Sequence, residues 1–174
     1  MVINLSTIVG GCALLGAGLL AACAAQRPQA ETMASREEIV ISRGPCFGFC
    51  PVYTVNVTPG GQVNFEGARH TALVGQRTSA VSRRVYENVR REVEVIRPPT
   101  GTTRDWHCDR RPTDTSNFTI EWKSADGVQT SLRYAVGCDS AEGRMIERLI
   151  ERQLQRLGVA EWAKQTTREG ASRG

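Results

Sequence analysis

Two cysteines in the stretch GPCFGFCPVY, residues 44 to 53, constrain this chain more than any other feature. Cys46 and Cys50 are four positions apart, and a fully extended strand would separate their Cα atoms by about 13 Å. A disulfide needs Cα atoms within about 7 Å, so a bridged pair requires a turn. Gly48 can take the positive φ of such a turn, and Pro51 favours a return to extended backbone. The pair could also be a reactive dithiol or part of a metal site.

The N-terminus indicates the compartment in which these cysteines are found. Residues 1 to 26 carry no charged side chain and contain an apolar run, residues 8 to 20. An apolar segment that ends in small residues is typical of a secretory signal peptide. Leu20-Ala21-Ala22-Cys23 resembles the bacterial lipobox, which implies that residues 1 to 22 are removed and Cys23 carries the lipid. Cys12 has too little apolar sequence before it for this role.

The predicted lipid at Cys23 makes the membrane one expected partner, because several acyl chains give a stable anchor. By resemblance to Gram-negative lipoproteins, Ala24 rather than Asp after the lipidated cysteine favours the outer membrane, with the protein facing the periplasm. An uncleaved transmembrane helix is the alternative, since the apolar run is just long enough to span a bilayer. Its glycine content and missing flanking charges favour the lipoprotein.

The mature chain divides into three parts by composition. Residues 23 to 37 have no hydrophobic period and contain Pro28, so we expect the lipidated cysteine and a flexible tether. Residues 38 to 162 are predicted to form a single globular domain. Residues 163 to 174 are polar and are expected to be a disordered tail.

Hydrophobic periodicity predicts the elements of the domain. Apolar and β-branched residues predict strands at residues 39 to 41, 52 to 57, 63 to 65, 118 to 122 and 128 to 136. Helical spacing predicts one helix from a cap at Thr78 or Ser79 to Pro98, and another from Asp139 or Ser140 to Gly158. The order β-β-β-α-β-β-α with short turns predicts an α+β fold. We expect an antiparallel sheet of about five strands with two helices packed on one face.

Four cysteines remain after the predicted lipidation, and an oxidising compartment favours their pairing as disulfides. Three connectivities are possible. Cys108 and Cys138 flank the second predicted hairpin, whose ends return to the same place, so we expect Cys108–Cys138 together with Cys46–Cys50.

Two chemical alternatives for the cysteines remain open. A redox pair at Cys46 and Cys50 lacks the Cys-x-x-Cys spacing and precedes a strand rather than a helix that would lower a thiol pKa. A zinc site could use all four cysteines with His107, but one short pair and two distant single cysteines are unusual for structural zinc. We therefore expect no metal and no cofactor.

Other functional classes find little support in the sequence. Asp105 to Asp109 contain an acid, an imidazole and a thiol, but adjacent residues of an extended chain point to opposite sides. With Cys108 oxidised as well, we expect no enzymatic activity. The net charge is +4 and the arginines are spread along the chain, so we expect no nucleic acid as a partner.

Residues Pro45-Cys46-Phe47-Gly48-Phe49-Cys50-Pro51-Val52-Tyr53 resemble the signature Pro-Cys-Phe-Gly-x-Cys-Pro-x-Tyr of a bacterial family of uncharacterised domains. The resemblance is specific over residues 38 to 97. The family has no established activity, so the resemblance implies no catalytic residue.

The sequence as a whole predicts a cell-envelope lipoprotein that is a non-catalytic binding or structural module. Its alternatives are a periplasmic thiol–disulfide protein that uses Cys46 and Cys50, and a cysteine-rich metal-binding envelope protein. A clipped turn would expose Phe47 or Phe49, which makes these aromatic residues the predicted surface for an envelope protein partner.

Overall fold

The structure is a computed structural model that describes residues 37 to 167. The predicted signal peptide, the predicted lipidation site Cys23 and the predicted tether up to residue 36 lie outside the described residues, and so does the tail from residue 168 onward. No helix in the described part of the chain is long and apolar enough to cross a membrane.

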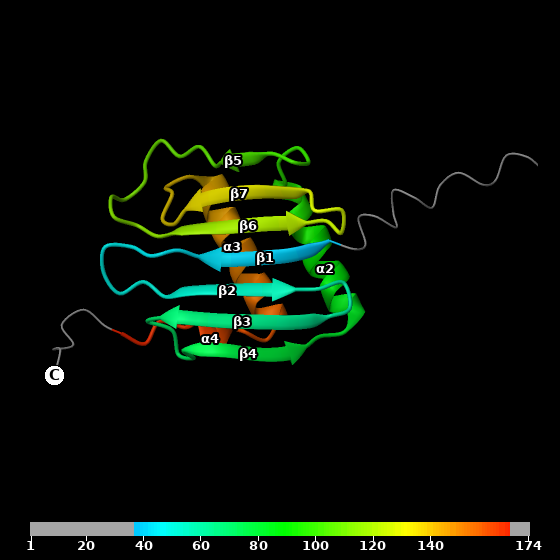
Figure 1. The fold of residues 1–174 in the computed structure, drawn as a ribbon. Helices are drawn as coiled ribbons and strands as arrows, with labels where there is room; N and C mark the ends of the chain where they lie inside the picture. The colour runs from blue at the N-terminus through cyan, green and yellow to red at the C-terminus, as the bar shows by residue number, and fades with distance from the viewer. Residues whose placement is uncertain (1–36, 168–174) are drawn as a thin grey trace, which may run out of the picture.

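One sheet of seven strands forms the front layer in Figure 1, in the order β4-β3-β2-β1-β6-β7-β5. All neighbouring strands are antiparallel except β5 and β7, which are parallel. The strands are β1 (Glu38–Arg43), β2 (Val52–Val57), β3 (Gln62–Arg69), β4 (Gly75–Ala80), β5 (Thr103–Asp105), β6 (Asn117–Lys123) and β7 (Gln129–Ala135).

The helices cover one face of this sheet, behind the strands in Figure 1. They are α2 (Arg83–Val93), the 3-10 helix η1 (Glu94–Ile96), α3 (Ala141–Arg156) and α4 (Ala160–Ala163). The side chain of Ser82 caps α2 by accepting from Val85 N, and Ser140 caps α3 by accepting from Gly143 N. These serine oxygens satisfy backbone donors that a helix N-terminus leaves without an internal partner.

The core lies between the sheet and the helices. Alternate strand residues point to this layer and are buried, as in β2, where Tyr53, Val55 and Val57 are 0 to 3% exposed. The helices supply apolar stripes at a spacing of three to four residues. Their buried members are Tyr86, Val89, Val93, Ile146, Leu149, Ile150 and Leu154. Burial of these two facing apolar surfaces provides the main stabilisation of the fold.

A buried ion pair fixes the point where the chain joins β1. The Glu37 carboxylate accepts hydrogen bonds from Nη1 and Nη2 of Arg97 at 2.8 and 2.7 Å. The Tyr86 hydroxyl donates to the carbonyl oxygen of Glu37 at 2.5 Å. Burial raises the pKa of Tyr86 to about 12, so the hydroxyl remains protonated and can donate near neutral pH. We call this end of the strands, where Glu37 and the turns after β2 and β6 lie, the proximal end.

The α+β class is confirmed, and the predicted antiparallel sheet of about five strands matches the structure only in part. The sheet has seven strands rather than about five, and the pairing of β5 with β7 makes it mixed rather than antiparallel. The two unpredicted strands are the edge strands of the sheet. All three residues of β5 are exposed, and β4 (GQRTSA) has no buried residue, so neither shows the alternation that marks a half-buried strand.

The helix prediction also needs two corrections. The first helix starts after Ser82 rather than at Thr78 or Ser79, because residues 75 to 80 pair with β3. A third short helix, α4, follows Gly158. Beyond it, Ala72 N donates to Lys164 O at 2.8 Å, so the described chain continues past residue 162 in contact with the domain.

Candidate functional site

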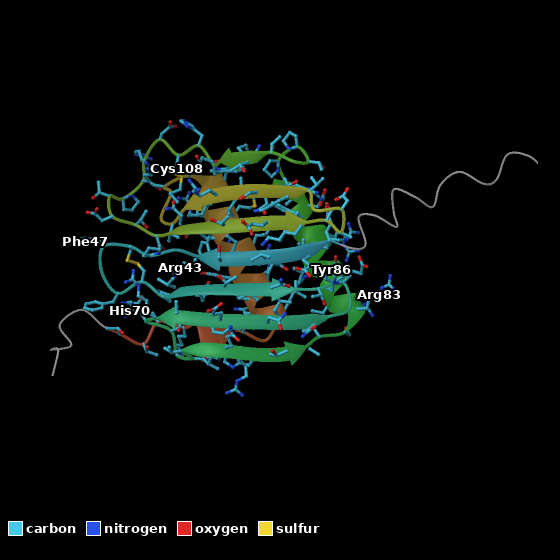
Figure 2. The ribbon with its side chains drawn as sticks, viewed as in Figure 1. Arg43, Phe47, His70, Arg83, Tyr86 and Cys108 are labelled. Atoms are coloured by element: carbon cyan, nitrogen blue, oxygen red, sulfur yellow. A yellow bond between two sulfur atoms is a disulfide. The ribbon has the colours of Figure 1, made fainter. Side chains whose placement is uncertain are left out.

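Both disulfides lie in loops at one end of the strands, opposite the proximal end. Strands β1, β3, β5 and β7 end there and β2, β4 and β6 begin there, so four loops meet. Figure 2 shows Phe47, His70 and Cys108 at this end, and Tyr86 and Arg83 at the other. We call this end the disulfide end; its loops are residues 44–51, 70–74, 106–116 and 136–140.

The Cys46–Cys50 bond closes a tight turn between β1 and β2. The two Cα atoms are 5.7 Å apart, within the distance that the sequence argument required. Gly48 sits in the middle with a φ of 147°, which an L side chain rarely adopts. Gly44 N donates to Asn117 O at 2.9 Å, and Phe47 N donates to Asp114 O at 3.2 Å. The loop is therefore held by its disulfide and by backbone hydrogen bonds to the first residue of β6 and to the segment before it.

The two aromatic residues inside this loop have different surroundings. The side chain of Phe47 is 90% exposed, the highest exposure among the large hydrophobic residues that the structure describes. Phe49 is half-buried and packs edge-on against the His70 ring, with 5.4 Å between ring centroids. His70 Nδ1 is 3.0 Å from Thr167 Oγ1. Of the two predicted contact residues, Phe47 is the one presented to solvent, and Phe49 joins the loop to the neighbouring segments.

The Cys108–Cys138 bond joins the long loop before β6 to the turn after β7. Its Cα atoms are 5.9 Å apart, and Cys138 is 3% exposed. Gly143 lets the first turn of α3 approach this site, because a Cβ there would lie 2.6 Å from the Cys138 carbonyl oxygen. The structure thus pairs the four cysteines in the connectivity expected from the hairpin geometry, and none of the four offers a free thiol.

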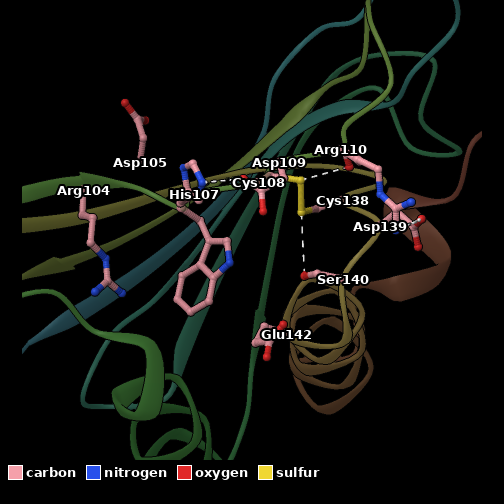
Figure 3. Close-up of a pocket in the computed structure, with 11 residues that line it drawn as sticks. Arg104, Asp105, His107, Cys108, Asp109, Arg110, Cys138, Asp139, Ser140 and Glu142 are labelled. Carbon is pink, nitrogen blue, oxygen red and sulfur yellow. Dashed lines mark hydrogen bonds and ion pairs between the residues drawn. A yellow bond between two sulfur atoms is a disulfide. The ribbon is translucent and has the colours of Figure 1, made fainter.

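A hollow of about 500 Å³ lies beside the Cys108–Cys138 bond, between β5 and the start of α3 (Figure 3). Four of its ionisable side chains form two pairs: His107 Nε2 is 2.7 Å from Asp109 Oδ1, and Arg110 Nη2 is 3.1 Å from Asp139 Oδ2. The His107 side chain is 88% exposed. Ser140 Oγ is occupied as the acceptor of the α3 cap.

This hollow lacks the constellation that nucleophilic catalysis needs. A cysteine nucleophile requires a thiolate in contact with a base, and Cys108 is oxidised. His107 is instead paired with Asp109 in solvent. Within residues 37 to 167, no group of three or more histidine, cysteine, aspartate or glutamate side chains is arranged to hold a metal ion. The disulfide end is therefore a surface of fixed loops, and its most exposed large apolar group is Phe47.

Comparison with known proteins identifies the domain. Residues 37 to 154 match the family model of a domain of unknown function, DUF6438. The chain belongs to the DUF6438 family. The match runs from the buried Glu37 through most of α3, so the DUF6438 domain contains the whole sheet and both disulfides. The chain has no significant match among curated proteins.

Removal of the two disulfides should have unequal effects on stability. The Cys108–Cys138 bond spans 30 residues and the Cys46–Cys50 bond spans 4, and loop closure restricts the unfolded chain more when the loop is longer. Replacing Cys108 and Cys138 by alanine should lower the free energy of unfolding by about 3.5 kcal/mol. The same change at Cys46 and Cys50 should lower it by about 2 kcal/mol. Urea unfolding of both double variants would test this order, and the reverse order would contradict it.

Proposed function

We propose that this DUF6438 protein is a lipid-anchored cell-envelope lipoprotein and a non-catalytic binding module that contacts an envelope protein partner through Phe47. The exposure of Phe47 carries the proposal. A large aromatic side chain that is 90% exposed buries almost no surface in its own domain, yet the loop beneath it is closed by a disulfide. A rigid exposed aromatic residue binds a partner with little loss of conformational entropy, which is a property of interface hot spots.

The lipobox-like Leu20-Ala21-Ala22-Cys23 supports a lipid anchor on Cys23 and release of residues 1 to 22. Ala24 supports an outer-membrane location facing the periplasm by resemblance to Gram-negative lipoproteins. Two disulfides in a domain of this size are compatible with an oxidising compartment.

The direction of β1 supports a lipid anchor at one end of the molecule and a partner contact at the other. The chain joins the domain at Glu37 and runs through six residues of β1, about 20 Å, before it reaches the Cys46–Cys50 loop. Phe47 therefore lies at the opposite end of the strands from the point where the proposed tether ends and the domain begins (Figure 2). On an anchored protein, this arrangement leaves Phe47 accessible while the proximal end faces the tether.

A second candidate is a periplasmic thiol–disulfide protein that uses Cys46 and Cys50. Its support is the half-buried position of both cysteines in a loop at the surface, where a thiol of another protein could reach them. Metal binding through the cysteines would require reduction of at least one disulfide, because zinc binds the thiolate form.

The lipid anchor can be tested by metabolic labelling in a Gram-negative host with an alkyne analogue of palmitate. The wild-type protein should take up the label and fractionate with membranes. The Cys23→Ser variant should lose the label and keep its uncleaved N-terminal segment. Cys12→Ser is the matched control and should behave like the wild type. Label that persists in Cys23→Ser would contradict the proposed anchor.

The partner surface can be tested by crosslinking the protein in intact envelopes and comparing two exposed apolar positions. Phe47→Ser should reduce the yield of the crosslinked partner by about tenfold or more, as expected for a hot-spot residue. Val95→Ser is the control, since Val95 is 72% exposed in η1, away from the disulfide end. An equal yield from Phe47→Ser and Val95→Ser would exclude Phe47 as the contact.

A further inference from the structure

Strand β1 ends in an arginine that faces the helix layer rather than solvent. Ile39, Ile41 and Arg43 alternate along β1 and therefore point to the same face. The two isoleucines are 0 and 1% exposed in the core. Burial lowers the pKa of the Arg43 guanidinium, and the nearby Tyr53 and Glu147 offset part of that effect. A charged side chain in this position of the central strand is costly unless it has a polar partner.

The neighbours of Arg43 orient the guanidinium and leave part of it free. Its Nε donates to Oγ of the fully buried Ser116 at 3.0 Å, and its Cζ lies 5.4 Å from the centre of the Phe118 ring. Within residues 37 to 167, Arg43 forms no ion pair, and its Nη1 and Nη2 donate to no oxygen. The two groups that bind carboxylates side by side are thus available.

Tyr53 adds a second donor beside Arg43. The two residues are directly opposite each other in the pairing of β1 with β2, so their side chains are neighbours on the same face. Tyr53 is 3% exposed and lines the cavity described below, and its hydroxyl forms no hydrogen bond with another residue in the range 37 to 167. Burial raises the pKa of Tyr53 above its ordinary value, so the hydroxyl is protonated at neutral pH and can donate.

A cavity of about 400 Å³ lies in front of these donors, lined by Arg43 and Tyr53 on the sheet and by Glu147 and Glu151 of α3 on the opposite wall. Glu147 is engaged, because its Oε1 accepts from the Tyr134 hydroxyl at 2.8 Å and from a backbone N–H at 2.6 Å. Glu151 forms no ion pair within residues 37 to 167. The volume is within the range of small-molecule sites.

We propose that this cavity binds a small ligand that has a carboxylate at one end and an amine at the other, such as a free amino acid or a short peptide. Nη1 and Nη2 of Arg43 and the Tyr53 hydroxyl hold the carboxylate, and Glu151 receives the amine. Lys164 also lines the cavity and is paired with Glu161, with 3.6 Å between Nζ and Oε2, so the lining carries charges of both signs. This balance favours a ligand of both charges over a phosphate. Pro51, directly after Cys50, lines this site and Phe47 does not, so the site is separate from the proposed contact at Phe47.

Calorimetric titration of the purified full-length protein with glycylglycine tests the site. We expect saturable binding with a dissociation constant below about 10 mM, which is suited to a ligand of this size. Glycylglycine amide lacks the carboxylate and should bind at least about tenfold more weakly, a loss matching one charge-assisted bidentate contact. Equal affinity for the two compounds, or no saturable binding of glycylglycine, would overturn the proposal. Inorganic phosphate that binds as tightly as glycylglycine would also overturn it.

Variants of the sheet wall locate the binding site. Arg43→Gln should weaken glycylglycine binding by about tenfold or more. Tyr53→Phe removes only the hydroxyl, preserves the core ring and should weaken binding by about threefold to tenfold. Arg84→Gln on the exposed face of α2 is the control and should bind as the wild type does. If Arg43→Gln is unstable, the affinity of Tyr53→Phe for glycylglycine tests the site alone. An affinity equal to that of the wild type would overturn the assignment of binding to this cavity.

Discussion

The central position of β1 is the constraint on which the rest of the structure depends. This strand pairs with β2, which follows it directly, and with β6, which comes more than 70 residues later. Strand β1 is hydrogen-bonded on both sides, and it runs from the proximal end of the sheet to the disulfide end. The buried pair of Glu37 and Arg97 fixes the start of β1 at the proximal end, and the Cys46–Cys50 turn follows its other end. The anchoring and binding roles proposed for the protein follow this separation.

The sequence predicts those parts of the fold that bury an apolar face. Both long helices and the two hairpins carry a clear hydrophobic period, and the structure places them close to the expected residues. The edge strands β4 and β5 were missed because an edge strand held mainly by backbone hydrogen bonds needs no apolar alternation. The parallel pairing of β5 with β7 is set by tertiary packing, and no local sequence pattern predicts it.

The candidate sites show a similar division. The cysteine pairing that the structure shows is the one expected from hairpin geometry and from the compartment that the sequence predicts. The different exposure of Phe47 and Phe49 depends on His70, which is about twenty residues away in the chain, so sequence alone could not separate the two. Arg43 could have been found, since it follows Ile39 and Ile41 in the same phase and an arginine at a core-facing position is unusual. Only the structure shows that, within residues 37 to 167, the Arg43 guanidinium donates through Nε to Ser116 and leaves Nη1 and Nη2 without an acceptor.

We propose that the two disulfides fix the loops of a binding module and take no part in electron transfer. The equilibrium reduction potential of the Cys46–Cys50 bond tests this claim most directly, measured by alkylation and mass analysis across a series of redox buffers. Structural disulfides have potentials below about −300 mV, and the account predicts a value in that range. A value between about −120 and −270 mV, as in thiol–disulfide oxidoreductases, would contradict it and favour a redox function for Cys46 and Cys50.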